Sequence, residues 1–239
     1  MDNFIVSDLD SDAPLSHGRI NADSYYDSHN FNSSFDNLSP IDFGIIHINI
    51  RSLPRNGDSL VMYLNTLTYK FPIICCSETW LNSSRFIDNI FPNYNQYHSM
   101  RPANQPYGGG TSIFIHKNLQ SEHLPDISCN DENIECVFAA IKLHNNNNIF
   151  IGCCYRQPNS SNSNYFIASL VDKLSNIDVH AHKILVGDFN FNLLNIENDH
   201  DCASFLDALL SLGLTQATMK PWLNVGPTLK TNIGQPWLF

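Results

Sequence analysis

Seven polar residues stand where short apolar runs end, at the points where buried strands pass into loops. They are Asn49 with Arg51 after FGIIHI, Glu78 after PIICCS, Tyr155 with Arg156 at the end of IGCCYR, and Asp188 with Asn190 after ILVG. Each one alone has an ordinary explanation as a turn former or a surface charge. An α/β scaffold builds its site from the loops at strand ends, so the seven together are candidates for one site.

Two of these residues have the chemistry of a site for a hard divalent cation. Mg²⁺ prefers oxygen ligands and is usually held by one or two carboxylates together with waters and substrate phosphate. Glu78 is therefore the candidate first ligand, with Asn49 beside it, and Mn²⁺ is the alternative ion. Such an ion polarises a phosphoryl oxygen and offsets developing negative charge, so the pair predicts metal-assisted phosphodiester hydrolysis.

The other five residues fit the remaining tasks of that reaction. Asp188 can orient or deprotonate an attacking water, and Asn190 can position it. Tyr155 can hydrogen-bond a phosphate oxygen. Arg51 and Arg156 supply local positive charge for the phosphates of the substrate.

The hydrophobic pattern predicts the elements that must position these side chains. Strands are predicted over residues 43–49, 72–76, 111–116, 134–143, 148–156 and 183–190. Two of them flank the run of Asn145 to Asn148, which favours an antiparallel hairpin because Asn tolerates the left-handed conformation of tight turns. Amphipathic helices are predicted after Asp58 as N-cap, over residues 166–174, and over residues 202–210 with Gly213 as C-cap.

The order of these elements is β-α-β, then a run of strands, then α-β-α. Two mixed β-sheets flanked by helices, an α/β layered sandwich, account for that order. Residues 1–40 carry seven aspartates and one arginine, −6 of the net charge of −10, and are predicted to be a disordered acidic leader. Residues 41–239 are predicted to form one domain, in which the stretch after Gly213 fits no complete element.

Composition excludes several classes of protein. With 13 Lys and Arg against 23 Asp and Glu in 239 residues, the surface is not that of a basic nucleic-acid coat protein. No apolar run reaches the roughly 18 to 20 residues of a membrane span, and the N-terminus lacks the features of a signal peptide. We therefore expect an intracellular protein without membrane contact, and the sequence indicates no obligate protein partner.

The cysteines and histidines have structural explanations. Seven Cys include the adjacent pairs Cys75–Cys76 and Cys153–Cys154 within apolar segments, which favours buried, reduced thiols over disulfides. His180 and His182 could hold zinc, although a polar loop before a strand is the favoured interpretation.

Five ordered motifs give the chain a resemblance to a known family. They are HINIRSL (47–53), SETWL (77–81), GGGTSIFI (108–115), YRQP (155–158) and GDFN (187–190). Over residues 43 to 228 the chain resembles the endonuclease/exonuclease/phosphatase superfamily. The spelling of the first three motifs is most similar to the apurinic-like endonuclease domain of non-LTR (LINE-type) retrotransposons.

The resemblance implies a four-layer α/β sandwich and Mg²⁺-dependent nicking of a DNA substrate, in the nucleus, to prime reverse transcription. Position by position, it implies that Asn49 and Glu78 form the metal side and that Tyr155 contacts phosphate. It also implies that Asp188 and Asn190 lie around the nucleophile.

Two departures from the family pattern bear on activity. Arg51 stands where many relatives outside the retrotransposon branch have an aspartate, while Glu135 matches a recurrent acid whose role stays open. Relatives continue past a Pro-Thr like Pro227–Thr228 to an Ile-Asp strand and a Ser-Asp-His end, whereas this sequence has no His after His200 and no Asp after Asp207. The resemblance thus implies a domain that is truncated at its C-terminus and lacks its last strands.

Three functions are compatible with this sequence. The first is a Mg²⁺-dependent, DNA-nicking endonuclease domain of a retrotransposon-type protein. The second is a catalytically dead remnant that at most binds nucleic acid or a partner. The third is a phosphoinositide or sphingomyelin phosphodiesterase on the same scaffold, for which the sequence shows no dedicated substrate loops.

Overall fold

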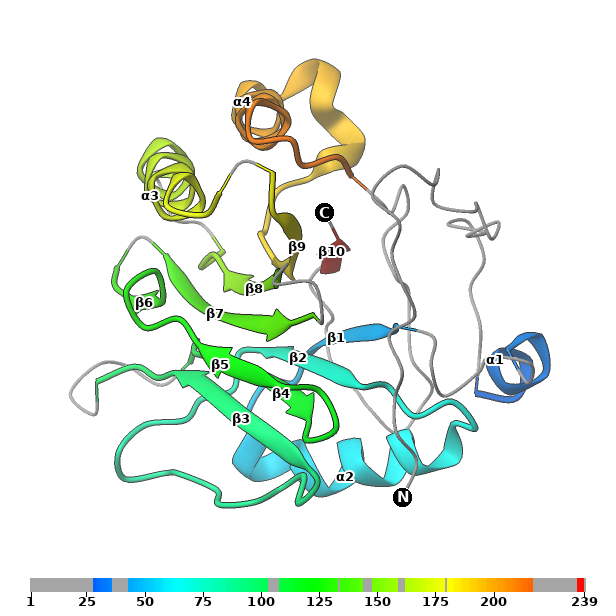
Figure 1. Cartoon of the computed structure of the whole chain (residues 1–239). Helices are drawn as coiled ribbons and strands as arrows, with labels where there is room; N and C mark the ends of the chain where they lie inside the picture. Colours follow the sequence, from blue (N-terminus) through cyan, green and yellow to red (C-terminus); the bar gives the residue numbers. More distant parts are fainter. Residues whose placement is uncertain are drawn as a thin grey trace.

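The computed structural model describes residues 28–35, 43–102, 108–132, 134–143, 148–158, 162–178 and 180–216, together with the backbone of residues 236–238. Its elements form four stacked layers (Figure 1). Helix α2 (Leu53–Thr66) forms the first layer, two β-sheets the second and third, and helices α3 (Ser163–Ser175) and α4 (His200–Ser211) the fourth. The predicted sandwich of two mixed sheets flanked by helices is confirmed.

The first sheet has four strands in the order β1-β2-β4-β3. The strands are β1 (Ile45–Asn49), β2 (Ile73–Ser77), β3 (Tyr94–Ser99) and β4 (Thr111–His116). Strands β1 and β2 run parallel because α2 connects them as a crossover, and the other pairs are antiparallel. The carboxyl ends of β1 and β2 therefore lie side by side.

The second sheet has six strands, with the path β10-β9-β8-β7-β5 and β6 paired to β7. The strands are β5 (Ser121–His123), β6 (Cys129–Asn130), β7 (Glu135–Lys142), β8 (Asn148–Tyr155), β9 (His182–Asp188) and β10 (Pro236–Leu238). Strands β7 and β8 form the predicted antiparallel hairpin, and β8 and β9 run parallel through the crossover α3. A 3₁₀ helix, η1 (Leu193–Asn198), leads from β9 to α4.

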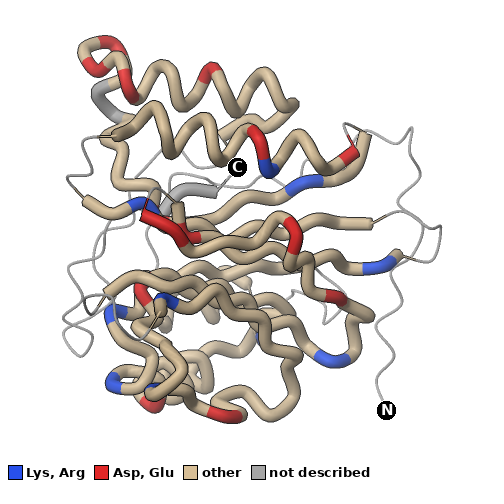
Figure 2. The backbone as a smooth tube through the Cα atoms, turned by 90° about the vertical axis from the view of Figure 1, so that its left-hand side faces the viewer, with Lys and Arg blue, Asp and Glu red and all other residues tan. Residues whose placement is uncertain are grey.

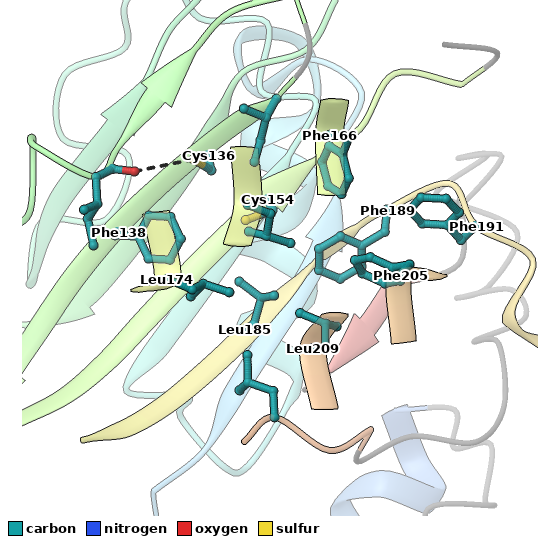
Figure 3. Close-up of a cluster of buried hydrophobic side chains, with 14 of the residues drawn as sticks. Cys136, Phe138, Cys154, Phe166, Leu174, Leu185, Phe189, Phe191, Phe205 and Leu209 are labelled. Carbon is teal, nitrogen blue, oxygen red and sulfur yellow. Dashed lines mark hydrogen bonds between the residues drawn. The ribbon is translucent and has the colours of Figure 1, made fainter. Parts of the chain in front are cut away.

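Three apolar cores fill the spaces between the four layers. Between α2 and the first sheet lie Ile50, Leu53, Leu60, Ile74, Cys76, Leu81, Phe91 and Phe114. Between the two sheets lie residues such as Ile73, Cys75, Ile113, Ile115, Val137, Ile141, Ile151 and Cys153. Between the second sheet and α3 and α4 lies a core in which Phe166, Phe189, Phe191 and Phe205 gather (Figure 3). The sheets are thus buried on both faces, which explains their almost continuous apolar sequences.

The adjacent cysteines divide between these cores, as strand alternation requires. Cys75 and Cys153 face the core between the sheets, whereas Cys76 and Cys154 face the helices. All seven cysteines are free thiols. The prediction of reduced, mostly buried cysteines is confirmed.

The first helix of the domain begins earlier than predicted. Helix α2 begins at Leu53, with Ser52 as its N-cap residue and Pro54 in its first turn, so Asp58 lies inside the helix rather than capping it. The backbone N–H groups of Ser52 and Leu53 donate to the carbonyl oxygens of Glu78 and Thr79, both at 2.8 Å. These carbonyls satisfy donors at the start of the helix, which explains why no side-chain cap is needed.

Four strands were not predicted from the sequence: β3, β10 and the short strands β5 and β6. Strand β3 is only partly buried and has the polar sequence YNQYHS. Its sequence therefore shows no alternation of apolar and polar residues from which a strand could be predicted. Strand β10 pairs its backbone with β9, with Pro236 opposite Asp188. The stretch after Gly213, which fitted no complete element in the sequence, thus contains one short strand at residues 236–238. Gly213 itself has the predicted C-cap conformation, with φ 76°.

The acidic leader contains one helix among its described residues, α1 (Ser28–Ser34). Asn32 Nδ2 donates to the carbonyl of Thr66 at 2.8 Å, Asn32 Oδ1 accepts from the N–H of Thr68 at 2.8 Å, and the Phe31 ring lies 5.9 Å from that of Phe71. Residues 28–34 of the predicted leader are thus helical and contact the chain just after α2. Residues 1–27 and 36–42 lie outside the described residues. No helix of the described residues is long and apolar enough to cross a membrane.

Candidate active site

Two rows of polar residues cross the sandwich at one end, one row in each sheet. The row of the first sheet is Asn49, Ser77, Thr111 and Ser99, which are paired in register across β1, β2, β4 and β3. The row of the second sheet is Asp188, Tyr155, Glu135 and Asn130, across β9, β8, β7 and β6. Residues paired across strands point to the same face, so each row presents its side chains together. We call this end of the sandwich the site end, and the opposite end the far end.

Asn49 joins the two rows. Its Nδ2 atom donates hydrogen bonds to Glu78 Oε1 at 2.9 Å and to Asp188 Oδ2 at 2.7 Å. Glu78 and Asp188 are 110 positions apart in the sequence, and this single amide brings their carboxylates into one cluster. The predicted convergence of Glu78 and Asp188 at neighbouring strand ends is therefore present in the structure.

Glu78 owes its position to a turn with an unusual backbone. The residue directly follows β2 and has φ 52°, and Trp80 two positions later has φ 56°. Left-handed backbone in residues other than Gly is uncommon and has a cost in free energy, so other contacts must hold it. The hydrogen bonds from the N–H groups of Ser52 and Leu53 to the carbonyls of Glu78 and Thr79 help to stabilise this turn.

Asp188 is a buried carboxyl group with an altered proton affinity. It is 1% exposed, and burial raises its pKa from 3.8 to about 6. The hydrogen bond from Asn49 lowers the pKa and the nearby Glu78 charge raises it. A carboxylate whose pKa lies near neutral pH can exchange a proton with a bound water, which a surface aspartate does poorly.

Tyr155 lies between Asp188 and Glu135 in the row of the second sheet. The side chain is 5% exposed, and its pKa is raised, first by burial and then by the charges of Glu78, Asp188 and Glu135. The phenol therefore stays protonated at neutral pH and can donate a hydrogen bond.

Asn190 belongs to the loop that follows Asp188. It has φ 50°, and its Nδ2 donates to the carbonyl of Arg156 at 2.6 Å. The N–H of Arg156 in turn donates to the carbonyl of Asp188 at 3.0 Å. These two bonds tie the ends of β8 and β9 together, so Asn190 shapes the loop beside Asp188.

The two predicted substrate-binding arginines differ in exposure and surroundings. Arg51 is exposed at the end of β1. Arg156 is 6% exposed, and its guanidinium lies 4.1 Å from the centre of the Phe191 ring and 3.4 Å from Ser163 Oγ. Because Arg156 is next to Tyr155 on the strand, its side chain points to the opposite face, toward the helix layer.

Glu135, whose role the sequence left open, is an organising residue of the site end. It is 1% exposed and forms a salt bridge with Arg101. Its other oxygen accepts the backbone N–H of Gly110. The sequence contained two signals of this arrangement, the triple glycine at residues 108–110 and an acid at the start of an otherwise apolar strand.

The site end also holds several buried oxygen atoms without a hydrogen-bond partner among the described residues. They are Asn49 Oδ1, Ser77 Oγ, Thr79 Oγ1, Thr111 Oγ1 and Asp188 Oδ1. Buried polar atoms are nearly always paired, so such a concentration marks a place where water or a ligand belongs.

The donor set fits Mg²⁺. Among the described residues there is no group of three or more His, Cys, Asp and Glu that could hold a metal ion. Mg²⁺ does not need one, since it is commonly bound by one or two carboxylates and keeps several waters. Glu78 supplies a carboxylate, and Asn49 Oδ1 is a buried amide oxygen without a partner among the described residues.

Comparison with known proteins shows which fold the chain has. No protein-family model and no curated protein matches the sequence. Among solved structures, the endonuclease domain of TRAS1, a telomere-specific non-LTR retrotransposon, aligns with a TM-score of 0.60 at 15% identity, over 83% of this chain and 84% of that chain. An AP endonuclease from Leishmania major aligns with a TM-score of 0.58 at 14% identity, over 80% and 76% of the two chains.

A third neighbour is the 3′ phosphatase NExo from Neisseria bound to a product DNA hairpin. It aligns with a TM-score of 0.55 at 15% identity, over 81% of this chain and 84% of that chain. Two of these neighbours are endonucleases and the third is a phosphatase, as their names state. The chain therefore shares its fold with these nucleases and phosphatases.

Proposed function

We propose that this protein is a Mg²⁺-dependent phosphodiester hydrolase that nicks DNA. The observation that carries the proposal is the cluster in which Asn49 joins the carboxylates of Glu78 and Asp188. Two carboxylates in one buried polar cluster repel each other, and a divalent cation relieves that repulsion. The fold, shared with nucleases and phosphatases, supports the same class of reaction.

Each residue of the cluster has a task in this reaction. When bound, Mg²⁺ supplies polarisation of the phosphoryl oxygen, with Glu78 and the Asn49 amide oxygen as its protein ligands. Asp188, with its pKa of about 6, accepts the proton of the attacking water. Tyr155 keeps its proton and donates a hydrogen bond to a phosphate oxygen. Asn190 holds the loop that places Asp188.

The distribution of cations supports a polyanionic substrate at the site end. Among the described residues, three exposed arginines lie in segments that begin or end there: Arg51, Arg55 and Arg85. The lysines lie toward the far end: Lys70, Lys117, Lys142, Lys173 and Lys183. Blue segments, which mark Lys and Arg alike, lie on both sides of the layered body in Figure 2. Arginine binds phosphate in a bidentate manner, so this segregation favours a phosphate-rich substrate at the site end.

DNA is the proposed polyanion. The Neisseria neighbour was solved with a product DNA hairpin, and the TRAS1 domain comes from a retrotransposon. The NIRSL and SETWL motifs of this sequence favour the retrotransposon branch within the superfamily. We therefore place the activity in an element-encoded protein that cuts its target DNA in the nucleus.

Relaxation of supercoiled plasmid in Mg²⁺ tests the proposal. Wild-type protein should nick the plasmid, and Glu78→Gln and Asp188→Asn should each lower the rate by roughly 10² to 10⁴. Glu122→Gln is the matched control, because Glu122 is an exposed acid paired with Lys142 at 2.7 Å, away from the site end. Equal nicking by wild type and Glu78→Gln would reveal a contaminating nuclease and contradict the proposal.

The same preparation separates the two other functions that the sequence allows. Salt-dependent DNA binding without nicking in Mg²⁺ or Mn²⁺ would identify a remnant that only binds nucleic acid. Hydrolysis of phosphoinositide or sphingomyelin vesicles, with no nicking of plasmid, would identify the lipid phosphodiesterase.

A further inference from the structure

We infer that Glu135 is a positioning residue that fixes the Glu78 turn through the glycine loop of residues 108–110. Its hydrogen-bond partners are Arg101, Gly110, Asn130 and Gln157, so it reaches the Glu78 turn through the backbone of the glycine loop. The inference rests on the proposed function in one respect, because it takes Glu78 to be the cation ligand. We call the contacts from Glu135 through residues 108–110 to the Glu78 turn the clamp. These contacts are present in the structure whatever the function is.

Glu135 has an unusually complete set of partners for a side chain that is 1% exposed. Oε1 accepts from Arg101 Nε at 3.0 Å and from Arg101 Nη2, and Gln157 Nε2 lies at 3.4 Å. Oε2 accepts from the backbone N–H of Gly110, and Asn130 Nδ2 lies at 3.4 Å. A buried carboxylate is retained at low cost only when it is paired and hydrogen-bonded in this way.

The glycine loop is shaped to receive this carboxylate. Gly109 and Gly110 have φ 61° and 81°, conformations that favour glycine. A Cβ atom on Gly109 would overlap Glu135 Oε2 and Arg101 Nε, and one on Gly110 would lie 2.7 Å from Thr79 Oγ1. The two glycines therefore allow the carboxylate on one side and the Glu78 turn on the other to approach the same backbone.

The loop passes this constraint on to Glu78 through two hydrogen bonds. The N–H of Thr79 donates to the carbonyl of Gly110 at 3.1 Å, and the N–H of Trp80 donates to the carbonyl of Gly109 at 2.9 Å. Thr79 directly follows Glu78, whose φ of 52° needs support from outside the turn. Glu135 thus holds the loop, and the loop holds the residues next to Glu78.

Strand β7 also takes part in an ordinary surface salt bridge, through Lys142, which can be compared with the buried pair of Glu135 and Arg101. Glu122 pairs with Lys142 at 2.7 Å, and both side chains are more than 40% exposed. Such surface pairs contribute little to stability. Glu135 differs because its ion pair is buried and its second oxygen is bonded to backbone. A pair that served only to stabilise β7 would need no contact with the glycine loop.

Amide hydrogen exchange of Glu135→Gln measures the clamp directly, with Glu122→Gln as the matched control. The amide NH₂ of Gln cannot accept from Gly110 N–H and Arg101 together as a carboxylate does. We expect exchange of the Thr79, Trp80 and Gly110 amides to rise about tenfold or more in Glu135→Gln. Exchange in the β7–β8 hairpin at the far end should not change, and Glu122→Gln should match wild type.

The Mg²⁺ affinity of the same proteins, measured by calorimetry, tests the effect on Glu78. Substitutions beside the ligands of a metal typically weaken affinity or activity roughly 10- to 100-fold, and we expect a loss of that size in Glu135→Gln. The KM for plasmid DNA should stay unchanged while kcat falls, because Glu135 does not contact the substrate. Arg101→Lys keeps the positive charge without the planar guanidinium and should give a smaller shift in both readouts. It also replaces Glu135→Gln as the test if that variant does not fold.

The outcomes separate the inference from the proposed function. Unchanged exchange of the three amides in Glu135→Gln, or an equal rise in Glu122→Gln, overturns the clamp. Faster exchange with unchanged Mg²⁺ affinity overturns the positioning role. If wild-type protein neither binds Mg²⁺ nor nicks DNA, the proposed function fails, and the exchange experiment still decides whether Glu135 holds the turn.

Discussion

The two ends of the sandwich are built differently, although the same strands run through both. The site end contains most of the residues other than Gly that have left-handed backbone: Arg51, Ser52, Glu78, Trp80 and Asn190. It also contains the buried oxygens without a partner among the described residues. The far end contains regular antiparallel pairing of β7 with β8, an exposed salt bridge, and apolar side chains such as Ile115, Ile141 and Ile149 in the core between the sheets.

This difference indicates that the far end stabilises the fold, whereas the site end contains features that destabilise it. Strained backbone and unsatisfied polar groups cost free energy and persist only where the surrounding structure holds them. The far end and the three cores supply that support. The site end retains groups that suit chemistry, namely a carboxyl group with a pKa of about 6 and a bridging amide. This contrast can be tested with variants that remove a destabilising group at the site end or a packed side chain at the far end.

The largest expected effect on stability concerns Asp188. Its pKa is raised from 3.8 to about 6, so the folded state holds the proton more tightly than the unfolded state, and ionisation destabilises the fold. The cost appears as pH rises through this window and reaches the order of 3 kcal/mol above pH 6. Asp188→Asn should thus be more stable than wild type at pH 8 by about that amount, and the difference should vanish near pH 3.5.

Urea unfolding of both proteins in a chelator at the two pH values measures this difference. Equal stability of wild type and Asp188→Asn at pH 8 would show that the buried carboxylate has no cost, and that the site end is not strained in this way.

A smaller effect of opposite sign is expected from His47 on β1. Both ring nitrogens are buried without a partner among the described residues, and burial lowers the pKa from 6.5 to about 3. The unfolded state takes up a proton below pH 6.5 that the folded ring refuses, so stability is lost as pH falls from 6.5 toward 3. At pH 5 the loss should be about 2 kcal/mol.

His47→Leu removes the titrating group and should escape this loss. The stability of the variant relative to wild type should therefore increase by about 2 kcal/mol between pH 7.5 and pH 5, measured by urea unfolding. A constant difference between the two proteins over that range would show that the ring is protonated normally in the folded state.

The smallest effect compares two substitutions on the same face of β4. Thr111→Val at the site end removes a buried hydroxyl without a partner among the described residues, and should stabilise the protein by about 1 kcal/mol. Ile115→Val toward the far end removes one methyl group from the core between the sheets, and should cost roughly 0.5 to 1.5 kcal/mol.

Thermal unfolding of the two variants beside wild type checks the opposite signs. Destabilisation by both would mean that Thr111 has a partner that matters, such as an ordered water, and would weaken the contrast between the two ends.

The sequence was sufficient to predict the scaffold and the convergence of its acids. Buried strands are strongly apolar here, so their positions follow from hydrophobic runs, and the polar residues that end them stand out. Glu78 and Asp188 could be placed together because both stand at the ends of buried strands, where a layered α/β fold gathers the loops of its site. The adjacent cysteines could be assigned to opposite faces for an equally local reason, the alternation along a strand.

Other features depend on contacts that no local pattern reveals. Strand β3 is polar, and pairing with β4 makes it a strand. The start of α2 depends on the carbonyls of Glu78 and Thr79, which are distant in sequence. The orientation of the Arg156 side chain could have been predicted, because neighbouring residues on a strand point to opposite faces and Tyr155 faces the space between the sheets. The sequence showed that Glu135 is a recurrent acid but not what it does. Its role became clear only from its contact with the glycine loop in the structure.

The central claim is that the Glu78–Asn49–Asp188 cluster is a divalent-cation site, and the stability of the protein with and without Mg²⁺ tests it most directly. A cation that binds only the folded state raises the free energy of unfolding by about 2.7 kcal/mol at 100 times its dissociation constant. We expect saturating Mg²⁺ at pH 7.5 to stabilise wild type by an amount of this order, and to leave Glu78→Gln unchanged. Equal stability of the wild-type protein in Mg²⁺ and in chelator would contradict the account.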